Sequence, residues 1–257
     1  METICEPRRL DHAWSAQYER LARVFAQIIG STTGDIVEIG CGRGQLTIPL
    51  SKQIPLSKIV AVDRFQGPYR GDRQRLRTAL QNEGLEDRVK LVHSDCWRWF
   101  ENQSCSAHDV LISSELLAEL DSAELRRFVA ETYRVLRLGG LTVHSFLSPY
   151  GINPRQRRLI TADSDPRWTK YPPKEWFSPS PELVRRKLLQ AGFAKIRVHR
   201  VPSRIRFIGS AARILLRRWG VRQAFMKLNK EKLDEDGLEP PDWIVVEARK
   251  SRTHPIT

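Results

Sequence analysis

The 257-residue sequence has no apolar run near the length of about 18 residues that a membrane-spanning helix requires. Its beginning, METICEPRRLDHAW, lacks the apolar core of a secretory signal peptide. No two cysteines form a CxxC pair, which argues against a zinc site and against a disulfide framework. The cysteines are Cys5, Cys41, Cys96 and Cys105. We therefore expect a cytoplasmic protein with reduced thiols, no membrane span and no bound metal ion.

The charge of the chain is concentrated in one region. The net charge is +13, yet residues 153–232 alone hold 21 Lys/Arg against 5 Asp/Glu. Such segregation bears on binding partners rather than on the fold. The length and the 40% hydrophobic composition predict one domain over residues 1–257 with a sizeable core.

The stretch Ile36 to Leu46, IVEIGCGRGQL, combines β-strand formers, one carboxylate and three alternating glycines. A helix is expected to begin close to Gln45. A buried parallel strand, a tight glycine turn and a helix N-terminus together form a nucleotide-binding corner. Glycine suits this turn because the backbone must adopt positive φ and approach a ligand closely. The glycines are Gly40, Gly42 and Gly44, and the carboxylate is Glu38.

The spacing G-x-G-x-G, with an acid two positions earlier, differs from the dinucleotide fingerprint G-x-G-x-x-G. It resembles the first motif of the Rossmann-like (class I) S-adenosylmethionine (SAM) dependent methyltransferases. The resemblance implies SAM as cofactor, S-adenosylhomocysteine as product, and a loop that passes under the methionine and ribose. It assigns cofactor contacts to Glu38, Gly40, Gly42 and Gly44. Taken alone, the glycine triplet also fits a strand-to-helix turn without a ligand.

Two acids follow later predicted strands. Asp63 ends the strand Lys58 to Asp63, where a carboxylate can accept two hydrogen bonds from a ribose diol. Asp95 follows the strand Arg88 to His93, and in the resembled family an acid there binds the adenine amino group. The alternatives are a strand-end cap for Asp63 and an N-cap of a short helix for Asp95. We also expect the cofactor to contact Arg64, Cys96 and Ser113.

Strands and helices alternate over the first 146 residues, which predicts a parallel, doubly wound sheet. The phrase YRVLRLGGLTV resembles the family's turn into strand five, so we expect Gly139-Gly140 to end a helix before a strand from Leu141 to Phe146. Strands six and seven are expected at Ala194 to Val201 and Asp242 to Lys250. The resemblance implies an α/β Rossmann-like fold of seven strands, parallel except for the last. Further helices are predicted at Asp11 to Ile29, at Asp72 to Asn82 and from Pro181 to about Gln190.

Two segments depart from this pattern. Residues 147–181 are rich in proline and aromatics and are expected to form an irregular lid or acceptor segment. Residues 202–241 form a basic, partly helical insertion between strands six and seven. We expect this insertion to be part of the acceptor surface.

The basic region leaves the methyl acceptor open. Arginines at 204, 206, 213, 217, 218 and 222 interleave with apolar residues. This pattern fits RNA or a ribonucleoprotein bound through residues 202–232, an anionic membrane surface, or a helix that covers the protein's own core. A small or lipid-like acceptor is equally compatible. Strand four is expected at Asp109 to Ser113. The absence of an N-P-P-[YF] motif after it argues against adenine-N6 and glutamine-amide acceptors, and the absence of paired cysteines argues against cytosine-C5 chemistry.

The segment SELLAELDSAE after strand four resembles the double-E loop of protein arginine methyltransferases. Glu115 and Glu124 could clamp a guanidinium there, although Asp121 to Glu124 could equally cap the following helix. We expect Glu115 alone to be the catalytic residue, lining the acceptor pocket. His144 in strand five is interpreted as a structural hydrogen-bonding residue. A partner protein that binds SAM without turnover is the alternative to an enzyme.

Overall fold

The computed structural model describes residues 3–5, 10–30, 34–66, 73–169 and 179–251. The chain divides into two units. Unit 1 consists of Met1–Gln17, Leu147–Ser178 and Arg200–Ile244, and unit 2 of Tyr18–Phe146, Pro179–His199 and Val245–Thr257. Within the ranges described, no helix is long and apolar enough to cross a membrane.

Unit 2 is organised around a seven-stranded sheet with the order β4-β3-β2-β5-β6-β9-β7. The strands β4, β3, β2, β5 and β6 pair in parallel, and the last strands are antiparallel. This confirms the predicted Rossmann-like fold. The strand bounds are β2 (Ile36–Ile39), β3 (Ile59–Asp63), β4 (Val89–His93), β5 (His108–Ser114), β6 (Leu136–Leu147), β7 (Phe193–Val201) and β9 (Trp243–Lys250).

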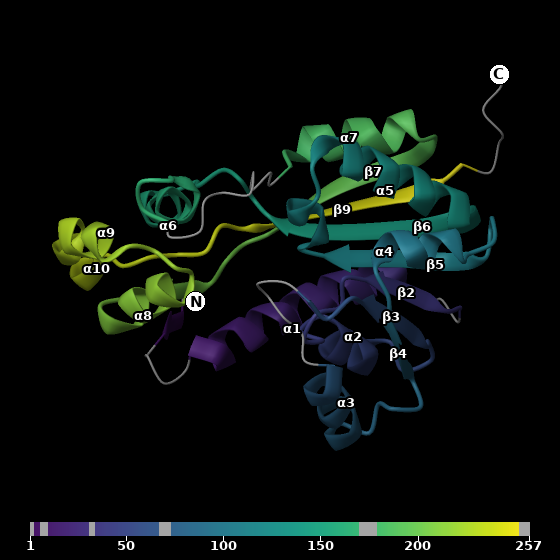
Figure 1. The fold of residues 1–257 in the computed structure, drawn as a ribbon, viewed down its shortest axis with the longest axis horizontal. Helices are drawn as coiled ribbons and strands as arrows, with labels where there is room; N and C mark the ends of the chain where they lie inside the picture. Colours follow the sequence, from purple (N-terminus) through teal and green to yellow (C-terminus); the bar gives the residue numbers. More distant parts are fainter. Residues whose placement is uncertain (1–2, 6–9, 31–33, 67–72, 170–178, 252–257) are drawn as a thin grey trace. The chain divides into compact units, whose positions relative to one another are not determined.

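Helices cover both faces of this sheet, with α5 and α7 on one side and α1 and α2 on the other (Figure 1). All four residues of β2 are buried, as expected for a strand covered on both faces. The predicted helices lie close to their expected positions. Their bounds are α1 (Leu10–Ile29), α2 (Thr47–Gln53), α3 (Arg73–Asn82), α4 (Cys96–Glu101), α5 (Ser122–Val135) and α7 (Pro181–Gln190).

Strand β6 begins earlier than the sequence predicts. Helix α5 ends at Val135, and Gly139-Gly140 lies inside β6 rather than ending the helix. The ladder between β5 and β6 is irregular between His108 and Val110. A Cβ on Gly140 would lie 2.8 Å from the Arg137 carbonyl oxygen. The glycine therefore allows a bulged strand, and the prediction that it stops a helix is wrong.

Unit 1 contains more regular structure than expected. Its elements are β1 (Thr3–Cys5), α6 (Pro154–Ser164), β8 (Ile205–Phe207), α8 (Ser210–Arg218), α9 (Gln223–Leu228) and α10 (Lys230–Glu235). Residues 147–181 were expected to be irregular, but α6 begins within them, where Asn153 caps its N-terminus and Pro154 occupies its first turn. Tyr171, Trp176 and Phe177 of that segment lie outside the described residues. β1 pairs in parallel with β8.

The apolar side chains of the basic insertion face inward. Leu215, Leu216 and Phe225 are at most 3% exposed and share one core cluster with Leu159 and Phe207. The insertion contains three short helices rather than one basic helix. The apolar faces of these helices cover the core of unit 1. This agrees with the interpretation of the basic region as a helical segment that covers the protein's own core.

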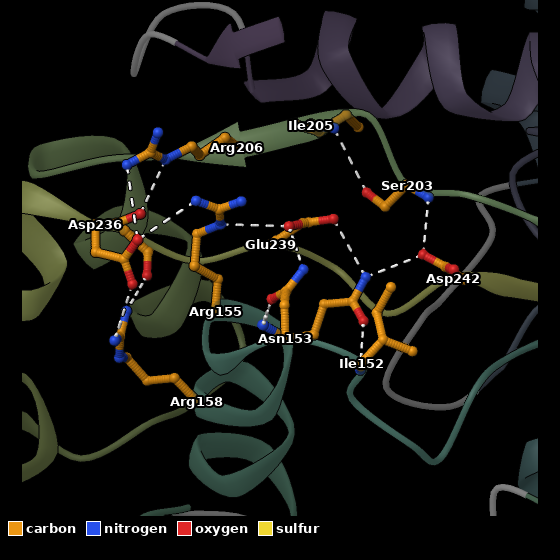
Figure 2. A network of polar contacts seen from close by, with 12 residues as sticks. Ile152, Asn153, Arg155, Arg158, Ser203, Ile205, Arg206, Asp236, Glu239 and Asp242 are labelled. Atoms are coloured by element: carbon orange, nitrogen blue, oxygen red, sulfur yellow. Dashed lines mark hydrogen bonds and ion pairs between the residues drawn. The ribbon is translucent and has the colours of Figure 1, made fainter. Parts of the chain in front are cut away.

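Acidic residues just beyond the basic region pair with its arginines (Figure 2). Asp236 lies 3.2 Å from Arg158 and 3.4 Å from Arg155, and Asp234 pairs with Arg213. Arg206 donates to the carbonyl oxygens of residues 235 and 236. The charge that the sequence segregates is thus partly neutralised within the fold.

Candidate functional site

The alternating glycines form a loop that joins β2 to α2 in unit 2. Gly40, Gly42 and Gly44 have φ values of 80°, 51° and 74°, so all three adopt the left-handed region. The amide of Gly40 donates to the Val62 carbonyl oxygen at 2.8 Å, and the amide of Gly44 donates to the Cys41 carbonyl oxygen at 2.8 Å. Strand β3 therefore anchors the start of the loop, and the second half of the loop closes on itself.

The three glycines have different surroundings. A Cβ on Gly44 would lie 2.3 Å from Leu76 Cδ1, so this glycine is required for packing against α3. A Cβ on Gly40 would lie 3.4 Å from Leu116 Cβ. At Gly42, a Cβ would meet no heavy atom of the described residues within 4 Å. Gly42 is therefore the position where the backbone is open to a ligand, which fits a bound SAM.

Asp63, half-buried at the end of β3, holds the glycine loop through its carboxylate. Its Oδ2 accepts from the Gly42 amide at 2.8 Å, and its Oδ1 accepts from the Phe65 amide at 2.5 Å. A carboxylate offers about four acceptor positions. Each oxygen can therefore accept one further hydrogen bond, as the predicted ribose contact requires, while the carboxylate shapes the loop as well.

Glu38 lies inside the protein, under the glycine loop. Its side chain is 1% exposed, and its Oε2 accepts from Thr47 Oγ1 at 2.7 Å. Burial raises the pKa of Glu38 to about 7, and the nearby Asp63 adds to this effect. The carboxyl group links β2 to the first residue of α2. A direct contact between Glu38 and the cofactor stays a prediction.

Asp95, which follows β4, caps a helix, as one of its two interpretations predicts. Its Oδ1 accepts from the Trp97 amide at 2.8 Å, so Asp95 is the N-cap of α4. Burial, followed by the charge of Asp95, raises the pKa of Cys96 to about 12 and keeps this thiol protonated. The side chain of Arg64 is exposed. The predicted contacts of these three residues with the cofactor remain predictions.

Ser113 is less accessible than its predicted role suggests. Its hydroxyl is fully buried and lies 2.8 Å from His144 Nδ1. His144 Nε2 lies 2.7 Å from Thr142 Oγ1, which donates its proton to the Leu111 carbonyl oxygen. Thr142 must therefore accept from Nε2–H, which leaves Nδ1 to accept from Ser113. Burial lowers the pKa of His144 to about 3, so the imidazole is neutral and has the structural role predicted for it.

Glu115 follows β5 directly and lies beside the glycine loop. Its backbone adopts the left-handed conformation, with φ of 63° and ψ of −10°. Its amide donates to the Ser145 carbonyl oxygen at 2.8 Å. The next residue, Leu116, begins the 3-10 helix η2 (Leu116–Glu119), and its side chain packs against Gly40. The predicted catalytic residue and the predicted cofactor loop thus lie together at the carboxyl edge of the sheet.

Glu124 forms a capping box with Asp121 at the start of α5. Asp121 Oδ1 accepts from the amides of Ala123 and Glu124 at 2.8 Å each, and Glu124 Oε2 accepts from the Asp121 amide at 3.0 Å. This reciprocal capping box begins α5. The capping interpretation of this segment is the one that the structure shows.

Sequence reasoning did not identify two residues of this site. Thr47 holds Glu38, and a hydroxyl at the start of the predicted helix was the available signal. Leu116 packs on the glycine loop, and no local pattern identifies a contact between segments so distant in the chain.

Among the described residues, no group of three or more His, Cys, Asp or Glu side chains is arranged to hold a metal ion.

The comparisons with known proteins agree with this geometry. Residues 36–140 match the family described as "Methyltransferase domain". The human MTRF1L release factor glutamine methyltransferase is 35% identical over 63 residues, which are 23% of this chain and 17% of that protein. The chain thus spans about a sixth of the length of that curated relative.

Solved structures share the fold at low identity. A SAM-dependent methyltransferase from Archaeoglobus fulgidus has a TM-score of 0.55 and 17% identity, over 91% of this chain and 94% of that one. The [4+2]-cyclase SpnF has a TM-score of 0.60 and 17% identity, over 91% and 81% of the two chains. A fold shared with a cyclase does not by itself define a reaction. The family match, the strand order and the glycine loop together identify this chain as containing a class I SAM-dependent methyltransferase domain.

Proposed function

We propose that this protein transfers the methyl group of SAM to a nucleophilic acceptor at the carboxyl edge of the unit 2 sheet. The observation that carries the proposal is the packing of Leu116 against Gly40, which brings Glu115 beside the glycine loop. Ligands of open parallel sheets bind at this edge. Bound SAM supplies an already activated methyl group, so the protein's main task is to position the two reactants.

Each residue of the site then has a defined task. The loop Gly40–Gly44 approaches the cofactor closely at Gly42, and Asp63 accepts hydrogen bonds from the ribose while it holds the loop. Asp95 is proposed to accept from the adenine amino group in addition to capping α4. Glu115 faces the acceptor, orients its nucleophilic atom and accepts a proton where the acceptor must lose one. The products are S-adenosylhomocysteine and a methylated acceptor, and the proposal requires no metal ion.

We propose a small or lipid-like molecule as the acceptor. The ion pairs of Arg155, Arg158 and Arg213 reduce the positive charge that would favour RNA. The sequence also lacks the N-P-P-[YF] motif that is expected for a glutamine-amide acceptor. This argues against the acceptor class named for the human relative, a release factor glutamine methyltransferase. A phosphoethanolamine N-methyltransferase 2 from Haemonchus contortus shares the fold, with a TM-score of 0.56 and 15% identity over 91% of this chain and 52% of that one.

The test is methyl transfer from radiolabelled SAM to a cell extract separated into RNA, protein, lipid and small-molecule fractions. We expect label in the lipid or small-molecule fraction, and a large loss of label with Glu115→Gln at unchanged affinity for S-adenosylhomocysteine. Label in RNA would overturn the proposed acceptor. RNA binding would then weaken with salt at a log–log slope of about −0.7 to −0.9 per neutralised phosphate.

Binding without turnover is the remaining outcome of the same experiment. Calorimetric binding of S-adenosylhomocysteine together with no label in any fraction would identify a non-catalytic SAM-binding protein.

We propose that the reaction takes place in a reducing compartment such as the cytoplasm, because Cys41, Cys96 and Cys105 are free thiols.

A further inference from the structure

The residues around the end of β5 and β6 fix the backbone from which Glu115 projects. We propose that hydrogen bonds from β6 hold Glu115 in its left-handed conformation, so that His144 and Ser145 are positioning residues of the acceptor site. This inference rests on the proposed function for the role of Glu115. We call Ser113, Ser114, His144 and Ser145 the β5–β6 clamp.

The clamp joins the two strands on both faces of the sheet. Ser113 is in register with His144, and Ser114 with Ser145. Successive side chains in a strand point to opposite faces, so each pair acts on its own face. Ser113 Oγ lies 2.8 Å from His144 Nδ1, and Ser145 Oγ donates to Ser114 Oγ at 3.0 Å. The last two residues of β5 are therefore fixed before the chain leaves the sheet.

The next residue is the strained one. A non-glycine residue at a φ of 63° is disfavoured by contacts of its Cβ, and it persists only where the surroundings hold it. At Glu115, the main-chain hydrogen bond to the Ser145 carbonyl oxygen provides this restraint at 2.8 Å. Ser145 therefore restrains both Ser114 and Glu115, one through its side chain and the other through its backbone.

His144 extends the clamp into the core. Its second nitrogen bonds to Thr142, which bonds in turn to the Leu111 carbonyl oxygen of β5. The side chains of His144, Thr142 and Ser145 are all fully buried. A chain of bonds whose members are buried and satisfied is rigid. The imidazole thus connects the strained end of β5 to its buried middle.

The clamp also affects the cofactor loop. If the backbone of Glu115 relaxed to an extended conformation, the chain would continue in another direction and Leu116 would leave Gly40. The clamp therefore sets the place of the acceptor carboxylate and the packing of the glycine loop together. A positioning role of this kind predicts a change in the local conformation of Glu115 that a general loss of stability does not produce.

The test follows the Glu115 backbone by NMR in the full-length protein. The variant Ser113→Ala/Ser114→Ala removes both side-chain bonds of the clamp with little change in volume. We expect the carbon shifts of Glu115 to lose their left-handed values and its amide to exchange with solvent about tenfold faster. Ser114→Ala alone should change the carbon shifts and the amide exchange rate of Glu115. Ser114→Thr keeps the hydroxyl, so it should keep the wild-type values of both.

Thr132→Val is the matched control. Thr132 is fully buried in α5, and its hydroxyl has no hydrogen-bond partner among the described residues. This variant should keep the shifts and exchange rate of Glu115. Wild-type values in the clamp variant would overturn the inference, and the single variants supply the same readout if the double variant does not fold. Full activity of Glu115→Gln would instead refute the acceptor role and leave the NMR result intact.

Discussion

The carboxylates of Glu38, Asp63 and Glu115 lie at the ends of neighbouring strands, yet their surroundings give them different tasks. Glu38 is buried and bonds only within the protein, as far as the described contacts show. Asp63 is half-buried and retains acceptor capacity beyond its two backbone bonds. Glu115 is half-buried and projects from a strained backbone. Their removal should accordingly change different measurable properties.

Asp63→Ala should weaken binding of S-adenosylhomocysteine by about 1.5–3 kcal/mol, the contribution of hydrogen bonds to a charged group. Isothermal titration calorimetry measures the change directly. Asp87→Ala is the matched control, because Asp87 is an exposed aspartate just before β4, at the opposite end of the strand from Asp95. Equal affinities for the Asp63→Ala variant and the wild type would remove Asp63 from the cofactor site.

Glu38→Gln should change the pH dependence of stability. The folded-state pKa of Glu38, about 7, lies above its ordinary value of 4.5, so the folded state binds this proton more tightly than the unfolded state. Its contribution to the unfolding free energy is present at low pH and is lost as pH rises toward 7, by roughly 3 kcal/mol in total. Urea unfolding across this range should show a smaller decline for the variant, because Gln carries no titrating proton.

The difference between the pH profiles of Glu38→Gln and wild type contains the contribution of Glu38 and not that of His144. The pKa of His144 is lowered to about 3, so His144 contributes stability that is lost as pH falls below its ordinary value of 6.5. That contribution is the same in both proteins and cancels in the difference. Identical pH profiles for the two proteins would contradict the buried, protonated Glu38.

Substitutions at two glycines should separate folding from binding. Gly44→Ala places a Cβ against Leu76 at a positive φ and should destabilise the protein by about 1–3 kcal/mol. Gly42→Val meets no described atom close by, although its φ of 51° strains any residue with a Cβ. We expect this variant to lose some stability, to fold, and to fail to bind the cofactor. Thermal melting and calorimetry distinguish the two effects. A Gly42→Val variant with normal affinity would show that the ligand does not approach there.

At the scale of elements, the start of α5 tests the two interpretations of Glu124. Gln can replace Glu in a capping box, so Glu124→Gln should keep both the stability and the methyl-transfer activity. Glu124→Ala removes only the bond to the Asp121 amide, so it should cost less than the about 0.5–2 kcal/mol that loss of the N-cap residue itself costs. A guanidinium clamp would instead need the negative charge. Loss of activity in Glu124→Gln at unchanged stability would therefore restore the arginine interpretation.

Some elements could be predicted because their signals are local. The glycine loop, Asp63 and the strands β2 to β5 follow from apolar runs and turn residues within a few positions. Gly139-Gly140 misled the prediction, because whether a glycine pair ends a helix or allows a bulge depends on the partner strand. Asn153 and Pro154 did carry a local signal for α6, but the many prolines that follow obscured it.

At the scale of the whole molecule, pairing of charges distant in sequence decides what the basic composition means. The window of residues 153–232 stops just before Asp234, Asp236, Glu239 and Asp242, which pair with its arginines or hydrogen-bond to its polar groups. No sequence window shows which acid meets which base. The positive charge of unit 1 is therefore partly an internal requirement of its fold.

Asp242→Ala should destabilise unit 1 more than Asp234→Ala does. The Asp242 side chain is 3% exposed, pairs with Arg200, and accepts from Gln156 Nε2 at 2.9 Å and from the Ser203 amide at 3.1 Å. Its removal leaves buried donors unsatisfied and should cost about 2–4 kcal/mol in urea unfolding. Asp234 is more exposed, so its loss should have a smaller effect. A reversed order would contradict the buried network.

The strand order also determines when the sheet can be completed during synthesis. β9 is the last of the described strands, yet it lies between β6 and β7. Until the ribosome has made residues 243–250, the sheet has an open edge at β6, and β7 has no partner. A chain released before that point exposes the unpaired edges of β6 and β7, which promote aggregation. Truncated products of this protein should thus be insoluble and subject to quality control, even though the glycine loop and Glu115 are already complete.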